Sequence, residues 1–113
     1  MIRYPFPAAA AAAVLLACAP AAHAAVPAPV TVKIANFTFG PEKISISPGV
    51  TVTWVNEDDI PHTVVASDNK TFRSKVLDTG ERFSFTFTVA GTYSYYCSIH
   101  PHMTGKVVVV KPA

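Results

Sequence analysis

The sequence has little cysteine, methionine and charge. It contains two cysteines and two methionines in 113 residues, and only 14% of the residues are charged. The formal net charge is +2 with no basic stripe, which argues against nucleic acid as a partner. The apolar run from Ala8 to Ala19 is shorter than the roughly 20 residues that a membrane-spanning helix needs. Internal repeats and low-complexity linkers are also missing, and the length suits one small domain.

The first 24 residues have the features of a secretory signal peptide. Arg3 supplies the positive charge, the alanine-rich run follows, and Ala22-His23-Ala24 fits the small-x-small rule for cleavage. We therefore expect residues 1–24 to be removed on export and residues 25–113 to form the mature domain in the periplasm, without a transmembrane span.

The two cysteines fall on different sides of this expected cleavage site. Cys18 ends the stretch Leu15-Leu16-Ala17-Cys18, which resembles a bacterial lipobox and offers an alternative, a lipoprotein anchored through Cys18. Leu16 fits such a box poorly, so we favour cleavage after Ala24. Cys97 is then the lone mature thiol and has no partner for an internal disulfide. A lone thiol in an oxidising compartment has to be buried or occupied, which is the first indication of a bound ligand.

The mature chain alternates apolar and polar residues with a period of two. The apolar positions of the four clearest segments are Val30, Val32 and Ile34; Ile44 and Ile46; Val50, Val52 and Trp54; and Phe83, Phe85, Phe87 and Val89. Such alternation predicts half-buried strands, and the turn-forming residues between them predict a two-sheet β-sandwich. No stretch shows a 3.6-residue period. The segment from Asn69 to Asp78 is the least strand-like and could hold a short helical turn.

The stretch YYCSIHPHM, from Tyr95 to Met103, concentrates possible metal ligands. Cys97, His100 and Met103 recur every third residue after a strand end, and Pro101 interrupts further pairing. A tight loop could direct all three side chains toward one point. Taken alone, the string also fits a buried structural cysteine beside exposed histidines.

A fourth candidate lies in the segment TVTWVNEDDIPHTVVAS, where His62 precedes a strand. On its own, His62 would be an ordinary polar loop residue. Together with the thiol, the second imidazole and the thioether, it completes a set that suits copper, with two histidines and a cysteine in a plane and methionine as the weak axial ligand. Zinc fits less well, because thioethers are not among its usual ligands.

These motifs resemble the cupredoxins, the family of type 1 blue copper proteins, and within it they are most similar to the amicyanins. The stretches VTWVNEDDIPHTV and AGTYSYYCSIHPHMTGKVVVV carry the resemblance, which extends from Val30 to Lys111. It implies an all-β Greek-key sandwich of about eight strands with one copper at one end. Carried over by position, the copper ligands are His62, Cys97, His100 and Met103.

Two positions depart from the family pattern. Thr63 stands where the family usually has an asparagine that ties the two ligand loops together, and its hydroxyl has a shorter reach. His102 replaces an aromatic residue on the partner-facing rim. Because neighbouring side chains diverge, we expect His100 to be the ligand and His102 to lie at the surface. The acids from Glu57 to Asp59 are either a solvated loop or a patch that steers a basic partner.

The resemblance implies a monomeric electron carrier that moves single electrons between exported or membrane-bound redox proteins, such as a dehydrogenase and a c-type cytochrome. An alternative is copper handling without redox turnover, but copper chaperones favour methionine- or histidine-rich sites and one of the two methionines is Met1. An oxidase or reductase would need further histidine pairs, and the mature chain has three histidines, His62, His100 and His102. We therefore expect a carrier and not an enzyme.

Overall fold

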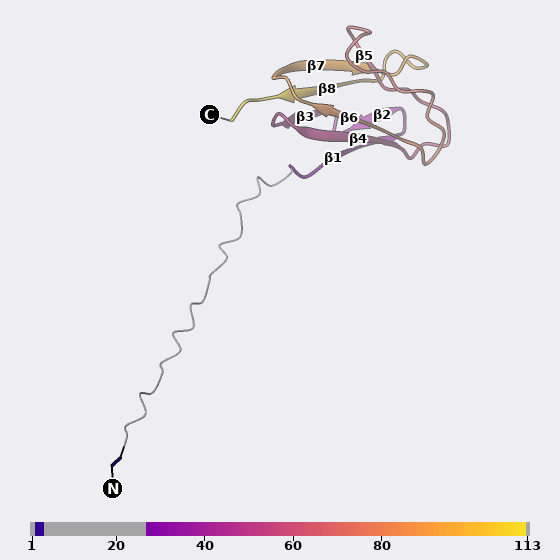
Figure 1. Ribbon diagram of the computed structural model, residues 1–113. Coiled ribbons are helices and arrows are strands. Elements are labelled where there is room, and N and C mark those ends of the chain that lie inside the picture. Colours follow the sequence, from indigo (N-terminus) through magenta and orange to yellow (C-terminus); the bar gives the residue numbers. More distant parts are fainter. Residues whose placement is uncertain (1, 4–26, 113) are drawn as a thin grey trace.

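The computed structural model describes residues 2–3 and 27–112, and these hold eight strands and no helix (Figure 1). The strands are β1 (Val30–Ala35), β2 (Thr38–Gly40), β3 (Lys43–Ile46), β4 (Val50–Asn56), β5 (Val65–Ala66), β6 (Arg82–Phe87), β7 (Gly91–Tyr96) and β8 (Thr104–Val109). The expected all-β fold is confirmed. Apart from residues 2–3, the expected signal peptide, including Cys18, lies outside the described residues.

Two four-stranded sheets face each other as the layers of a sandwich (Figure 1). One has the strand order β2-β1-β4-β6, and the other has the order β3-β8-β7-β5. The pairs β1–β4 and β3–β8 are parallel, and the remaining pairs are antiparallel. Strands that are distant along the chain are therefore neighbours in both sheets, as expected for a Greek-key sandwich.

The period-two alternation decides which side chains enter the core. In β1, Val32 and Ile34 are fully buried while Thr31 is exposed. In β4, Trp54 is fully buried, and its ring packs edge-on against that of Tyr95 with the centroids 5.3 Å apart. Each fully buried aliphatic or aromatic side chain contributes about 1.5–3 kcal/mol through the hydrophobic effect. This core provides a stiff support for the loops at its end.

Tyr95 packs closely against β8 because a glycine on that strand leaves room for its ring. It pairs with Gly105, and a Cβ atom at that position would collide with the Tyr95 ring and hydroxyl. Burial raises the pKa of the Tyr95 hydroxyl to about 12, so the ring stays neutral in the core. The close approach fixes the end of β7, from which Cys97 follows directly.

The segment from Asn69 to Asp78 does not form the helical turn that its sequence allowed. It begins with bends at residues 69–71 and then forms isolated bridges, Val65 with Arg73 and His62 with Leu77. The His62–Leu77 bridge has two backbone hydrogen bonds, with N···O distances of 3.1 and 2.8 Å. An extended backbone lets this segment cover the loop that carries His62, which a helical turn would not do.

The turn between β1 and β2 has an unusual backbone. Asn36 and Phe37 both have positive φ angles, 52° and 59°, as a two-residue type I′ turn requires. Asparagine tolerates this left-handed conformation, but for a residue as large as phenylalanine the conformation is less favourable by about 1–2 kcal/mol. Turn formation alone would favour glycine at position 37.

Candidate metal centre

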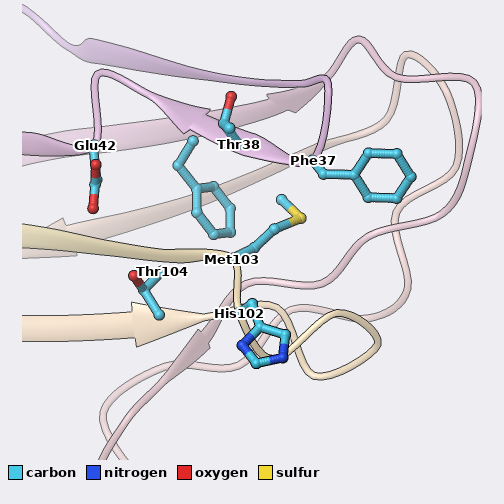
Figure 2. Close-up of a pocket in the computed structure, with 7 residues that line it drawn as sticks. Phe37, Thr38, Glu42, His102, Met103 and Thr104 are labelled. Carbon is cyan, nitrogen blue, oxygen red and sulfur yellow. The ribbon is translucent and has the colours of Figure 1, made fainter.

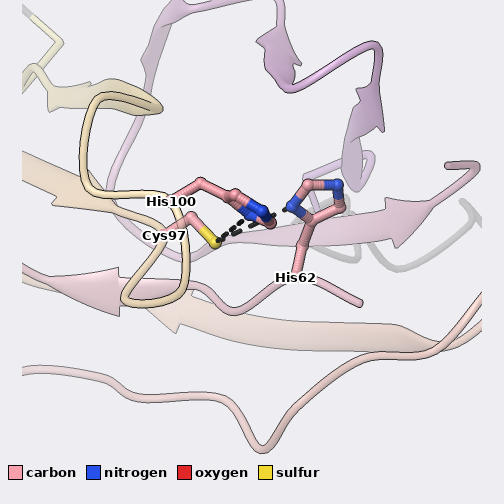
Figure 3. Close-up of side chains that lie close together, drawn as sticks. All are labelled: His62, Cys97 and His100. Atoms are coloured by element: carbon pink, nitrogen blue, oxygen red, sulfur yellow. Dashed lines mark hydrogen bonds between the residues drawn. The ribbon is translucent and has the colours of Figure 1, made fainter. Parts of the chain in front are cut away.

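Three side chains meet at one end of the sandwich, where Figure 3 shows the Cys97 sulfur facing both His62 and His100. The Cys97 Sγ atom lies 3.7 Å from His62 Nδ1 and 3.8 Å from His100 Nδ1. All three candidate donor atoms lie within 4.8 Å of one another. The structure therefore brings together an imidazole from the β4–β5 loop (residues 57–64) and two donors from the ligand loop (residues 97–103).

The β4–β5 loop is organised by a buried asparagine at the end of β4. Asn56 Nδ2 donates to the carbonyl oxygens of Ile60 and Leu77, each at 2.9 Å, and its Oδ1 accepts from the Asp58 N–H at 2.9 Å. The side chain is fully buried, so these bonds replace those that water would make. Asn56 thus sets the shape of the loop that leads to His62.

Asp58 orients the His62 ring. Its Oδ2 atom lies 2.9 Å from His62 Nε2, while Nδ1 faces the sulfur. A carboxylate on the outer nitrogen of a metal-binding histidine fixes the ring and its tautomer, so that Nδ1 presents a lone pair. The hydrogen bond to His62 is the largest cause that holds the pKa of Asp58 below its usual value. Asp58 is therefore more than a solvated loop acid, and its place four residues before His62 was the available clue.

Cys97 is fully buried and accepts hydrogen bonds at its sulfur. The Thr63 N–H donates to Sγ at 3.4 Å, and the Thr63 hydroxyl lies 3.8 Å from it. Burial raises the pKa of the thiol, but the Thr63 N–H and the two imidazoles outweigh burial and lower the pKa to about 6. The site therefore favours the thiolate, the form that binds soft metals.

Thr63 also joins the two loops. Its hydroxyl oxygen accepts from the Ser98 N–H at 2.7 Å and lies 2.7 Å from the Ser98 hydroxyl. The shorter side chain thus ties the β4–β5 loop to the ligand loop, the task expected of asparagine at this position.

The ligand loop closes on itself through backbone hydrogen bonds. The Cys97 N–H donates to the Met103 carbonyl at 3.1 Å, and the Met103 N–H donates to the His100 carbonyl at 2.9 Å. Met103 is 5% exposed and belongs to the same buried cluster as Cys97. In Figure 2 its thioether points toward Phe37, whereas the exposed His102 points another way. Both residues line a small pocket of about 130 Å³.

The two histidines near the sulfur differ in their access to solvent. The His62 ring is fully buried, whereas His100 is half-buried, as expected for a loop-tip residue. Pro101 and His102 beside it are exposed. Phe37, which sequence reasoning missed, lies against both imidazole rings.

A buried thiol and two imidazole Nδ1 atoms around it form a donor set for a soft or borderline metal, with a thioether in the same buried cluster. Two histidines, a cysteine and a weakly bound methionine are typical of type 1 copper. The residues present therefore fit a single copper ion, and no group with a carboxylate majority is found that would suit magnesium or calcium among the described residues.

Comparison with known proteins agrees with this chemistry. The chain is 38% identical to amicyanin of Paracoccus denitrificans over 84 residues, which is 71% of this chain and 64% of that protein. The structure of an oxidized amicyanin mutant matches with a TM-score of 0.68 and 34% identity, over 72% of this chain and 81% of that one. A copper-containing nitrite reductase from Thermus scotoductus matches with a TM-score of 0.71 and 39% identity, over 82% of this chain but 25% of that one.

The family model of the cupredoxin-like domain matches most of the sequence, from residue 8 to residue 109. The fold, the clustered donors and these matches lead to one conclusion: the chain belongs to the cupredoxin family.

Proposed function

We propose that this protein is a type 1 blue copper electron carrier that holds one copper ion with His62, Cys97, His100 and Met103. The observation that carries the proposal is the placement of two imidazole Nδ1 atoms 3.7 and 3.8 Å from the sulfur of one buried cysteine. The similarity to amicyanin supports the same function.

Copper in such a site supplies one-electron chemistry between Cu(I) and Cu(II). The residues of this chain hold the donors in place. The backbone bridge between His62 and Leu77, the Asp58 carboxylate and the Thr63–Ser98 hydrogen bonds restrain the donor side chains. A restrained donor set changes little in geometry when the charge of the site changes, which favours rapid exchange of electrons.

His100 is the donor residue that a docked redox partner can reach, because it is half-buried and borders the exposed Pro101 and His102. The exposed acids Glu57 and Asp59 are close in sequence to His62 and favour a partner with a basic docking face. A dehydrogenase as donor and a c-type cytochrome as acceptor fit this role. The carrier acts as a monomer.

The proposed carrier is not an enzyme. The nitrite reductase is matched over only 25% of its length, so this similarity is to one part of a larger protein. A second copper centre would need more histidines than the three that follow residue 24.

The carrier is exported to the periplasm after removal of residues 1–24, in preference to a lipoprotein anchored at Cys18. Arg3, the apolar run and Ala22-His23-Ala24 support this proposal. In the described residues, no helix has the length and apolar character of a membrane span.

The test is the colour of the purified protein with Cu(II). The wild type should be intensely blue, and a reductant should bleach it reversibly without catalytic consumption of O2. Cys97→Ser should abolish the blue colour, because the thiolate is its source. A variant that remained blue, or a wild type that bound copper without becoming blue, would disprove the type 1 assignment.

A further inference from the structure

Phe37 is an exposed aromatic residue that contacts both candidate imidazoles. The centroid of its ring lies 5.1 Å from that of His100 at an interplanar angle of 86°, and 5.8 Å from that of His62 at 90°. The two imidazole rings are themselves 5.0 Å apart. Edge-to-face packing is a favourable arrangement of aromatic rings. Phe37 therefore joins the histidines of both loops in one three-ring cluster.

The backbone of Phe37 is in a conformation that its side chain disfavours. Its φ angle of 59° belongs to the left-handed region, where a type I′ turn ordinarily has glycine. A bulky residue that persists in such a conformation suggests a role for its side chain. Here the side chain reaches the imidazoles.

A carboxylate fixes this turn relative to His62. Asp58 Oδ2 accepts from the Phe37 N–H at 3.2 Å, and the same oxygen lies 2.9 Å from His62 Nε2. The ring and the backbone of Phe37 are thus both coupled to the β4–β5 loop. The position of the ring over the imidazoles is set by two independent contacts.

The His100 ring has fewer restraints on its orientation than the His62 ring. Within the described part of the chain, the His100 ring makes one hydrogen-bond contact, between Nδ1 and Cys97 Sγ at 3.8 Å. The His62 ring has contacts through both nitrogens, to Asp58 and to Cys97. Packing against Phe37 is therefore a main restraint on the orientation of the half-buried His100 ring.

We propose that Phe37 is a positioning residue, an aromatic clamp that holds the His62 and His100 rings in orientation and keeps water from the side of them that it covers. The proposal deepens the proposed function and rests on it, because the clamped rings are the proposed copper ligands. Phe37 is 52% exposed, so part of the residue stays accessible to solvent while its ring packs on the histidines.

The test compares four variants that separate the ring from the turn. Phe37→Gly and Phe37→Ala remove the ring, and glycine does so in the backbone conformation it prefers. Phe37→Tyr keeps the ring. Asn36→Gly is the matched control, because it eases the same turn at a φ of 52° without altering the ring.

The first measurement uses the metal-free protein. NMR relaxation of the imidazole nitrogens and carbons reports the mobility of the two rings. We expect Phe37→Gly and Phe37→Ala to increase the mobility of the His100 ring more than that of His62, whereas Phe37→Tyr and Asn36→Gly should match the wild type. Unchanged mobility in both ring-removing variants would overturn the proposal.

The second measurement is the reduction potential of the copper-loaded protein. Loss of the apolar cover admits water, which favours the more highly charged oxidised site, so the potential should fall in Phe37→Gly and Phe37→Ala and be restored in Phe37→Tyr. A potential equal to that of the wild type in the ring-removing variants would also contradict the clamp. A wild type that never turned blue would disprove the proposed function instead, and the metal-free measurement would still decide the role of Phe37.

Discussion

The two loops that supply the candidate ligands are held in different ways. The β4–β5 loop is fixed by side chains and by a neighbouring segment. Asn56 makes two hydrogen bonds to the loop and one to Leu77, Leu77 bridges to His62, and Asp58 contacts the His62 ring. The ligand loop is held mainly by two backbone hydrogen bonds of its own and by the hydrogen bonds that Thr63 makes with Ser98 and Cys97. The buried side of the site is therefore built as part of the core, and the exposed side is the part that can adapt.

The greatest change should come from removal of either histidine, and it tests whether free imidazole can replace each ring. His62→Ala and His100→Ala should both lose the blue spectrum, since each removes one imidazole donor. Added imidazole should restore colour in His100→Ala, because that position is half-buried, but not in His62→Ala, where the ring is fully buried. Absorption spectra during an imidazole titration provide the measurement. Equal rescue of both variants would contradict the difference between the loops.

A second prediction concerns the stability that Asn56 gives to the β4–β5 loop. Asn56→Ala leaves the carbonyls of Ile60 and Leu77 and the Asp58 N–H without this partner. Unpaired buried polar groups of this kind lower the free energy of unfolding by about 1–3 kcal/mol. Urea denaturation of the metal-free protein measures the loss. Ser94→Ala, at an exposed position of β7, is the control and should stay close to the wild type.

A third, smaller effect should appear in the reduction potential. Asp58→Asn removes a negative charge 2.9 Å from His62 Nε2, which disfavours the more positively charged oxidised site and raises the potential. Asp59 is next in the sequence but exposed, so Asp59→Asn removes a negative charge that solvent already screens. This variant should change the potential less. Cyclic voltammetry of the two variants makes the comparison. Equal shifts would show that Asp58 acts only through its charge at long range.

The smallest effect is expected from the turn after β5, which tests a region outside both loops. Asp68 accepts from the Lys70 and Thr71 N–H groups and from the Thr71 hydroxyl, and the hydroxyl is the largest cause that lowers the pKa of Asp68 to about 2. A carboxyl whose pKa is lower in the folded state stabilises the folded protein at pH values above its unfolded pKa, near 4. This contribution is lost as the pH falls through the folded pKa of about 2.

The measurement for Asp68 is an NMR titration of its carboxyl carbon, with urea denaturation at several acidic pH values. Asp68→Asn should remove this part of the acid sensitivity and leave the blue spectrum unchanged. An ordinary carboxyl titration in the wild type would show that the turn does not depend on the ionised form.

The sequence predicted the sandwich and the four candidate donors, because both leave local patterns. Period-two alternation marks β1, β3, β4 and β6, and the Cys-x-x-His-x-x-Met spacing places three donors in one loop. That the four residues bind copper stays a prediction. The three-residue strand β2 is too short to show an alternation, and the bridges at Arg73 and Leu77 depend on pairing with residues outside the segment from Asn69 to Asp78.

The supporting contacts of the site were the least accessible to sequence reasoning. Asp58 looked like one of three loop acids, and its contact with the His62 ring is what distinguishes it in the structure. Phe37 lies 25 positions from His62 and 63 from His100, so its contact with them depends on the packing of the β1–β2 turn. Such contacts follow from tertiary structure and have no periodic pattern to reveal them.

The pairing of β5 with β7 brings donors from distant parts of the chain together. Val65 pairs with Tyr96, and this antiparallel contact places His62 beside Cys97 although 35 residues separate them. Contacts between distant segments form late in folding, because a long loop must close first. A partly folded chain therefore has a thiol and one imidazole nearby in the sequence, but not the complete set of donors. We therefore expect the complete donor set to exist only in the folded chain, with the half-buried His100 on its solvent side.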